Sequence, residues 1–323
     1  MATPATTSPL SSVTGPSSRT GDRVFAGLTT GAGLFVLALI VAIAVFLLQK
    51  AIPAVQKDHT SFLRTKIWQP DNSPPVFGIA ALAFGTMLSS VIALCVAGPI
   101  ALGIALYISD YAPRRLAAPI GYLVDLLAAV PSVVYGLWGL LFLVPHSEGF
   151  QTFLGKHMGW IPLFDLGKNG VVGRSVLIAS LVLSIMILPI IAAISREIFL
   201  QVPQDNREAA LALGATKLEM IRLAVLPYSR SGVTGALMLG LGRALGETIA
   251  VALVLSLAPT TSFHILDANT GGTTIAANIA AQYQAAEPIG QQALIASGLV
   301  LFVITFAVNA LARWVISRGR VRA

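Results

Sequence analysis

PQDNREAALALGATKLEMIRLAVLP, residues 203–227, is a polar interruption between two long apolar segments. Pro203 suits the first position of a helix, where its missing N–H costs no hydrogen bond. Gly214 is the residue type that ends a helix, and Thr216 with Glu219 has the spacing of a capping box, which starts a second helix. Pro227 is expected to stop that second helix. The pattern therefore predicts two helices joined by a tight elbow.

The first helix of this elbow carries both charge and apolar surface. Arg207 and Glu208 are followed by the apolar run 209–213. An ordinary intracellular loop with charged helix ends is one interpretation. The other is a docking surface, because the apolar area exceeds what a solvated loop requires.

The composition places the chain in a membrane. Its 323 residues are 55% hydrophobic and 11% charged, whereas soluble domains are roughly 25% charged. The net charge of +7 comes from basic residues at the ends of apolar segments rather than from a basic patch, which favours membrane anchoring over nucleic-acid binding. The single cysteine, Cys95, excludes a disulfide framework or a thiolate metal site.

The apolar segments predict an all-α polytopic membrane protein with six transmembrane helices, because each segment is long enough to cross a bilayer. The predicted spans lie within residues 24–48, 76–109, 116–144, 175–195, 231–258 and 288–312. The predicted external loops are 49–75, 145–173 and 259–287. The predicted domains are a disordered cytoplasmic tail (1–22), the first span with its external loop (23–75), a transmembrane domain (76–316) with a cytoplasmic loop at 201–230, and a basic cytoplasmic tail (317–323).

The distribution of basic residues predicts the orientation. Six spans put both termini on the side of the elbow, and most of the 21 lysines and arginines lie on that side. By the positive-inside rule, the elbow and both termini are expected to be cytoplasmic.

A second informative stretch lies inside the predicted fifth span, where residues 240–248 read GLGRALGET. An arginine or an acidic residue at the bilayer centre costs about 2.5–3.5 kcal/mol. Arg243 and Glu247 are four residues apart, so a helix would place them on one face, where each partly neutralises the other. Gly242 and Gly246 form a strip of small residues that lets another helix approach.

Two roles for this pair remain open at this point. The pair could fix the register of the helix. Alternatively, the arginine could bind a tetrahedral oxyanion through its planar fork of donors, while the carboxylate releases the arginine or accepts a proton from the anion.

The elbow resembles the EAA loop of the permeases of ATP-binding cassette (ABC) importers, the binding-protein-dependent importer superfamily. The resemblance rests on Glu208-Ala209-Ala210, Gly214 and Leu226-Pro227. The family usually has isoleucine two residues before that leucine, where this chain has Ala224. The resemblance implies a type I ABC-importer fold and a coupling helix that lies in a cleft of the ATP-hydrolysing subunit. The residues to which it gives this coupling role are Arg207, Glu208, Ala209, Ala210 and Gly214.

Residues 243–248, RALGET, are similar to a signature of phosphate-importer permeases. Further similar stretches are 85–90, 107–113 and 129–136. The resemblance implies that Arg243 and Glu247 take part in phosphate passage. It also implies a sister permease subunit (PstA), a dimer of ATP-binding subunits (PstB), an extracytoplasmic phosphate-binding protein (PstS) and a multi-pass location in the cell membrane.

The sequence contains no Gly-x-x-x-x-Gly-Lys-[Ser/Thr] phosphate loop, so it is not expected to hydrolyse ATP itself. We expect no cofactor or metal in this chain, with ATP and Mg²⁺ used by the partner subunit. Two alternatives remain. One is a permease for another oxyanion, such as sulfate, molybdate or phosphonate. The other is a stand-alone secondary transporter, which would leave the apolar elbow unexplained.

Overall fold

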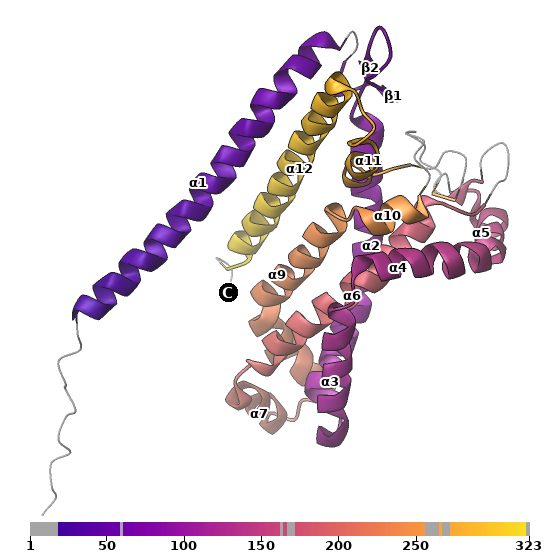
Figure 1. Cartoon of the computed structure of the whole chain (residues 1–323). Helices are drawn as coiled ribbons and strands as arrows, with labels where there is room; N and C mark the ends of the chain where they lie inside the picture. Colours follow the sequence, from indigo (N-terminus) through magenta and orange to yellow (C-terminus); the bar gives the residue numbers. More distant parts are fainter. Residues whose placement is uncertain are drawn as a thin grey trace, which may run out of the picture. The chain divides into compact units, whose positions relative to one another are not determined.

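The structure is a computed structural model that describes residues 19–58, 61–161, 164–166, 172–255, 265–266 and 272–320. Figure 1 shows that these residues are mostly helical, as predicted. The α-helices are α1 (Arg19–Lys57), α2 (Ala80–Leu106), α3 (Arg114–Ala128), α4 (Ser132–Trp138), α5 (Val144–Met158), α6 (Val176–Leu200), α7 (Gln204–Ala212), α8 (Lys217–Met220), α9 (Leu226–Leu245), α10 (Ile249–Val254), α11 (Ile275–Gln282) and α12 (Pro288–Arg320). Three π-helical turns are η1 (Tyr107–Tyr111), η2 (Gly139–Leu143) and η4 (Ile221–Val225).

The chain forms two compact units, Met1–Phe46 and Leu47–Ala323. In the first unit, α1 begins at Arg19, inside the segment predicted to be disordered, and residues 1–18 lie outside the described residues. At the other end of the chain, α12 extends to Arg320, into the predicted basic tail. Much of the predicted loop 259–287 also lies outside the described residues, but α11 shows that part of it is helical.

Among the described residues, four helices are long and apolar enough to cross a membrane, and a bent pair makes a fifth if it counts as one span. The four are Gly21–Lys57, Ala80–Tyr111, Val176–Leu200 and Pro288–Trp314, and the bent pair is Arg115–Ala128 with Ser132–Met158. Six spans were predicted. The differences lie in the third and fifth predicted spans, each of which is interrupted.

The third predicted span is broken at Pro131. The helices on either side of this break differ in direction by 86°. Pro131 has an extended ψ of 137° and precedes the first residue of α4, as expected from a residue that cannot donate a backbone hydrogen bond and restricts its predecessor. After the break, helical structure continues to Met158. The first half of the predicted external loop 145–173 is therefore helical.

The fifth predicted span is also interrupted. α9 ends at Leu245 and α10 begins at Ile249. Pro227, which was predicted to end the preceding helix, lies instead in the first turn of α9, directly after η4. A π turn is one of the local adjustments by which a helix accommodates a proline.

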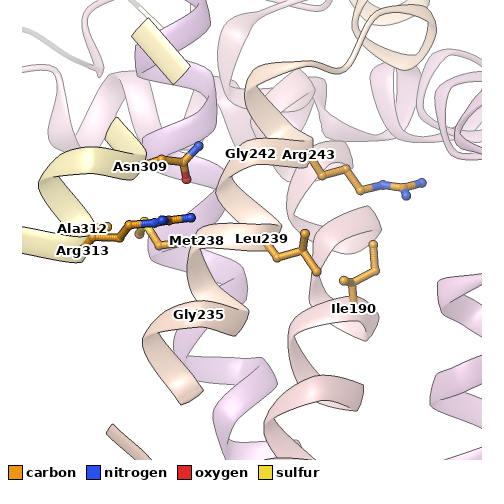
Figure 2. Close-up of a pocket in the computed structure, with 9 residues that line it drawn as sticks. All are labelled: Ile190, Gly235, Met238, Leu239, Gly242, Arg243, Asn309, Ala312 and Arg313. Atoms are coloured by element: carbon orange, nitrogen blue, oxygen red, sulfur yellow. The ribbon is translucent and has the colours of Figure 1, made fainter. Parts of the chain in front are cut away.

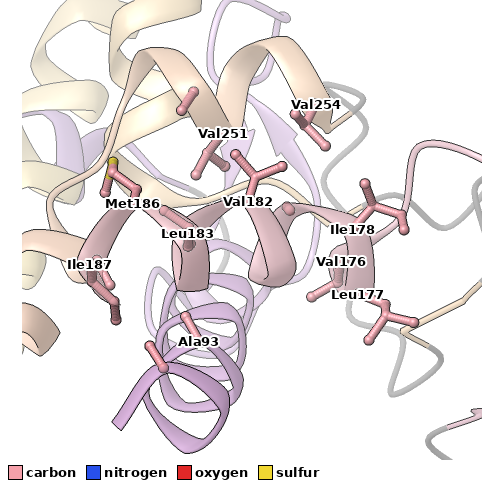
Figure 3. Packing of buried hydrophobic residues seen from close by; sticks show 14 of the residues in the cluster. Ala93, Val176, Leu177, Ile178, Val182, Leu183, Met186, Ile187, Val251 and Val254 are labelled. Atoms are coloured by element: carbon pink, nitrogen blue, oxygen red, sulfur yellow. The ribbon is translucent and has the colours of Figure 1, made fainter. Parts of the chain in front are cut away.

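The core of the second unit is centred on α2 and α6. Alanines recur every four residues along α2 at Ala93, Ala97, Ala101 and Ala105, and all four are fully buried. Small residues at this spacing let two helix backbones approach closely. Accordingly, the Ser184 hydroxyl of α6 donates a hydrogen bond of 3.3 Å to the Ala93 carbonyl. Figure 3 shows α6 side chains between Ala93 of α2 and Val251 and Val254 of α10.

A smaller apolar cluster lies at the end of α2 that begins with Ala80. The strands β1 (Trp68–Gln69) and β2 (Val76–Phe77) pair in antiparallel fashion there. β1 lies within the predicted external loop 49–75, whereas β2 occupies the first two residues of the predicted second span, 76–109. Trp68 packs edge-on against Phe77 and donates a 3.0 Å hydrogen bond from its indole nitrogen to Gln282. Thr86 of α2 accepts a 2.9 Å hydrogen bond from the Ile275 amide at the start of α11. These contacts hold the hairpin, α2 and α11 together.

Candidate functional site

Arg243 lies in the last turn of α9 and its side chain is exposed. It takes part in none of the ion pairs among the described residues. A cation near the C-terminus of a helix is favoured by the partial negative charge of the last carbonyls. The position of the guanidinium at this helix end is therefore electrostatically favourable.

Glu247 lies in the break between α9 and α10, and the prediction that it pairs with Arg243 on one helical face is wrong. Its side chain is only 7% exposed, and its carboxylate accepts a 3.3 Å hydrogen bond from the Ala250 amide in the first turn of α10. The reason is the end of α9 at Leu245, because residues four apart share a face only in a continuous helix.

Gly242 and Gly246 were predicted to let another helix approach closely, but the structure places the close approach at another glycine. A side chain at Gly242 would meet no atom within 4 Å, and one at Gly246 would meet only the backbone of its own turn. The close approach to α6 occurs two residues before Gly242, at Gly240, where an added Cβ would lie 2.6 Å from Ile191. The face of α9 that carries Gly242 is consequently open.

This open face lines a cavity of about 550 Å³. The residues around it come from α6, α9 and α12 and are Ile190, Gly235, Met238, Leu239, Gly242, Arg243, Asn309, Ala312 and Arg313. Figure 2 shows Asn309 and Arg313 extending from α12 toward α9, while Arg243 leaves α9 in another direction. Asn309 was not singled out from the sequence, and Arg313 was placed only at the end of the last span. Both lie on the same α12 face, four residues apart, so this spacing is the signal that could have found them.

The elbow has the predicted local structure. Gly214 adopts a φ of +84°, and the Ala215 and Gly214 amides donate to the carbonyls of Ala210 and Leu211 at 3.2 and 3.0 Å. This is the Schellman arrangement that ends a helix at a glycine. Both hydrogen bonds of the predicted Thr216 and Glu219 capping box are present. The hydrogen bonds from Thr216 lower the pKa of the Glu219 carboxyl below its ordinary value of 4.5.

The elbow presents a groove of about 640 Å³. Three residues of the predicted coupling set line it, namely Ala209, Ala210 and Gly214. Leu213 on its wall is 90% exposed. Glu208, also in the coupling set, is exposed beside the groove. The groove is lined mainly by apolar residues, together with Asn206 and Glu219.

Arg207, the fifth predicted coupling residue, points the other way. Its guanidinium forms an ion pair with Asp110 of η1 and donates to the Phe199 carbonyl at the end of α6. Its side chain is 17% exposed, and that of Asp110 only 1%. Asp110 lies within the stretch 107–113 that is similar to phosphate-importer permeases, but no role was predicted for it. Nothing in a sequence separation of 97 residues indicates this contact.

The family model described as "Binding-protein-dependent transport system inner membrane component" matches residues 97–321. The chain belongs to this family of ABC-importer permeases and is a multi-pass membrane protein and a transport component. The family resemblance read from the sequence is confirmed.

The relatives give a more particular likeness. The chain is 47% identical to "Phosphate transport system permease protein PstC 2" of Mycobacterium tuberculosis over 307 residues, which are 94% of each chain. It is 42% identical to "Phosphate transport system permease protein PstC" of Xylella fastidiosa over 299 residues, covering 92% of this chain and 91% of that protein. A crystal structure of a bacterial ABC transporter involved in the import of the acidic polysaccharide alginate matches 90% of this chain and 98% of that chain, with a TM-score of 0.54 and 17% identity. That last likeness shows a shared fold.

Proposed function

We propose that this chain is a membrane-spanning permease subunit of an ATP-driven importer that moves inorganic phosphate into the cytoplasm. The relatives named as phosphate transport permeases support the substrate. The structural observation that carries the proposal is Arg243, an exposed arginine in the last turn of α9 and one of the residues that line a cavity between α6, α9 and α12. An unpaired charge in such a segment is costly, and this is why intramembrane ionisable residues mark transport routes.

The chemistry of the site fits an oxyanion. The guanidinium of Arg243 offers a fork of donors that matches two oxygens of a tetrahedral anion. Glu247 lies four residues away along the chain, in the break after α9. In our proposal its carboxylate weakens anion binding at Arg243 enough for release, or accepts the proton of a protonated phosphate. Asn309 and Arg313 add polar groups along the same cavity.

The work for transport comes, in our proposal, from a separate ATP-binding dimer (PstB) that uses ATP and Mg²⁺. Its docking surface is the elbow groove with Glu208, Ala209, Ala210 and Gly214. The exposed Leu213 and the apolar groove walls support a surface that another protein covers. A sister permease (PstA) and an extracytoplasmic phosphate-binding protein (PstS) complete the complex.

We further propose a type I arrangement of six membrane crossings, with the elbow, residues 201–230, and both termini in the cytoplasm. This count takes the bent pair of α3 and α4–α5 as one crossing and adds α9, a 20-residue helix packed on α6. The permease domain then spans residues 76–316, following the first span with its external loop (23–75). The short ends 1–22 and 317–323 form cytoplasmic tails.

The test is phosphate uptake by the four-part complex in proteoliposomes. Arg243→Gln should abolish uptake of radiolabelled phosphate while the complex still assembles, and Glu247→Gln, which retains an acceptor for the Ala250 amide, should slow it. Arg230→Gln is the matched control, because Arg230 is an exposed arginine near the other end of α9. Normal uptake by the Arg243→Gln complex would refute the proposed role of the guanidinium.

Selectivity and energy source need separate arms of the same assay. Competition by sulfate, molybdate or phosphonate decides between phosphate and another oxyanion, since a guanidinium binds all of them. Uptake by the reconstituted chain alone, without ATP or partners, would instead establish a secondary transporter.

A further inference from the structure

The π-helical turn η1 contacts both arms of the elbow. Asp110 of η1 is paired with Arg207 of α7, as described above. The neighbouring Tyr111 ring lies under the Lys217 ammonium of α8, with 4.7 Å between the nitrogen and the ring centroid. The end of α2 is thus attached to the helix on each side of Gly214.

The Asp110 carboxylate is buried and fully partnered. One of its oxygens faces the Arg207 guanidinium, and the other accepts a 2.6 Å hydrogen bond from the Ser109 hydroxyl. The same guanidinium donates to the Phe199 carbonyl. A single arginine therefore ties α7 to the ends of both α2 and α6. Removing one partner of a buried ion pair is strongly destabilising, because it leaves an uncompensated buried charge.

Asp110 lies within a π turn. The Ala112 amide donates to the Tyr107 carbonyl across five residues at 2.7 Å, so the turn holds one residue more than an α-helical turn. One extra residue rotates the following side chains by about 100° around the helix axis. Such π turns within helices are frequent at functional positions.

An apolar cluster beneath the ion pair joins the same elements. Its buried members come from α2, α6, the link between α6 and α7, and the helix that follows Gly214, and they are Ala105, Phe199, Val202, Met220, Ile221 and Val225. Close-packed interiors transmit displacement because they deform little. A push on the elbow is therefore delivered to the end of α2, whose alanine strip packs along α6.

We propose that Asp110 is a positioning residue that transmits movement of the elbow to α2 and, through it, to the transport route. This inference rests on the proposed function, because it needs an ATPase partner to move the elbow. The role assigned to Arg207 changes accordingly: Arg207 anchors the coupling helix from inside rather than contacting the ATPase.

The test compares two paired carboxylates in the reconstituted four-part complex. Asp110→Asn removes the buried charge. Asp125→Asn is the matched control, because Asp125 also pairs with an arginine, Arg196 at 3.4 Å, but its side chain is 46% exposed. We expect phosphate transported per ATP hydrolysed to fall at least about tenfold for Asp110→Asn, since the buried pair is broken. For Asp125→Asn it should stay within about twofold, since exposed pairs contribute little.

Two further variants separate positioning from general stability. Asp110→Glu keeps the charge and should restore part of the ratio of transport to hydrolysis. Arg207→Lys keeps one ion-pair donor but loses the fork that also reaches Phe199, so we expect an assembled complex with an intermediate ratio. If the Asp110→Asn complex does not assemble, an unchanged ratio of phosphate transport to ATP hydrolysis in Arg207→Lys overturns the proposal.

Hydrogen exchange in the isolated full-length chain gives a readout that requires neither partner nor phosphate. Amides of α7 should exchange at least about tenfold faster in Asp110→Asn than in the unmodified chain, with little change in α5, because local opening of α7 becomes easier. Unchanged exchange, or an unchanged ratio of transport to hydrolysis, would overturn the inference. An unmodified complex that takes up no phosphate would instead refute the proposed function, and the exchange result would still decide whether Asp110 holds the elbow.

Discussion

Replacing Gly214 by alanine tests whether the shape of the elbow, rather than its surface, carries the coupling. Gly214 has a φ of +84°, and a Cβ built there meets no atom within 4 Å. The substitution therefore adds no collision, and its whole cost is the left-handed backbone, about 1–2 kcal/mol for an alanine. That cost is a factor of about 5–30 in the ratio of the native elbow to other conformations.

The assay measures ATP hydrolysis and phosphate uptake by the same reconstituted complex. We expect hydrolysis to continue and uptake per ATP to fall for Gly214→Ala, because a distorted elbow is displaced without moving the helices above it. Gly214→Asn should be less harmful, since asparagine tolerates this conformation better than alanine. Gly103→Ala is the matched control, because Gly103 lies in α2 with no atom within 4 Å of an added Cβ and with an ordinary helical φ. Unchanged coupling in Gly214→Ala would refute the reasoning.

Three further predictions concern local contacts. Gly136→Ala should lower the free energy of unfolding by about 1–3 kcal/mol, because overpacking strains a core and the new Cβ would lie 2.7 Å from the Ala250 Cα. A lower melting temperature would show this loss. In the control Gly149→Ala, the new Cβ meets no atom within 4 Å, so the melting temperature should not fall. Thr216→Ala should speed amide exchange at the start of α8 by the loss of a cap worth about 0.5–2 kcal/mol. The Glu219 carboxylate contributes fully to that cap above its ordinary pKa of 4.5. Because its folded-state pKa is lowered, this contribution should be lost as the pH falls through a value below 4.5. Amide exchange at the start of α8, corrected for the intrinsic pH dependence of exchange, measures the loss.

The elbow could be predicted from the sequence because its determinants are local. The Gly214 turn and the capping box of Thr216 with Glu219 each involve residues within five positions of one another. Their hydrogen bonds form inside the segment and need no distant partner. The inward direction of Arg207 could not be predicted in this way, because it depends on a carboxylate that only the fold brings near.

The breaks in the third and fifth predicted spans, in contrast, could not be predicted from the sequence of each segment. Apolar length alone predicted continuous helices through Pro131 and Gly246. Proline and glycine both occur within membrane helices, and Pro53, Pro99 and Pro189 lie inside α1, α2 and α6 without ending them. Whether such a residue breaks a helix depends on whether neighbouring segments can satisfy the freed backbone groups. That information belongs to the packed structure and not to the segment.

The break after Leu245 also alters the electrostatic argument for Arg243 and Glu247. In a continuous helix the two charges would have only each other. In the structure, Arg243 lies at the C-terminal end of α9, and Glu247 lies at the N-terminal end of α10, where it accepts a hydrogen bond from the Ala250 amide. Cations are stabilised at the first kind of helix end and anions at the second. Each charge is thus supported by its own backbone, so Arg243 needs no internal counter-ion, and this is the condition that our proposal of anion binding at Arg243 requires.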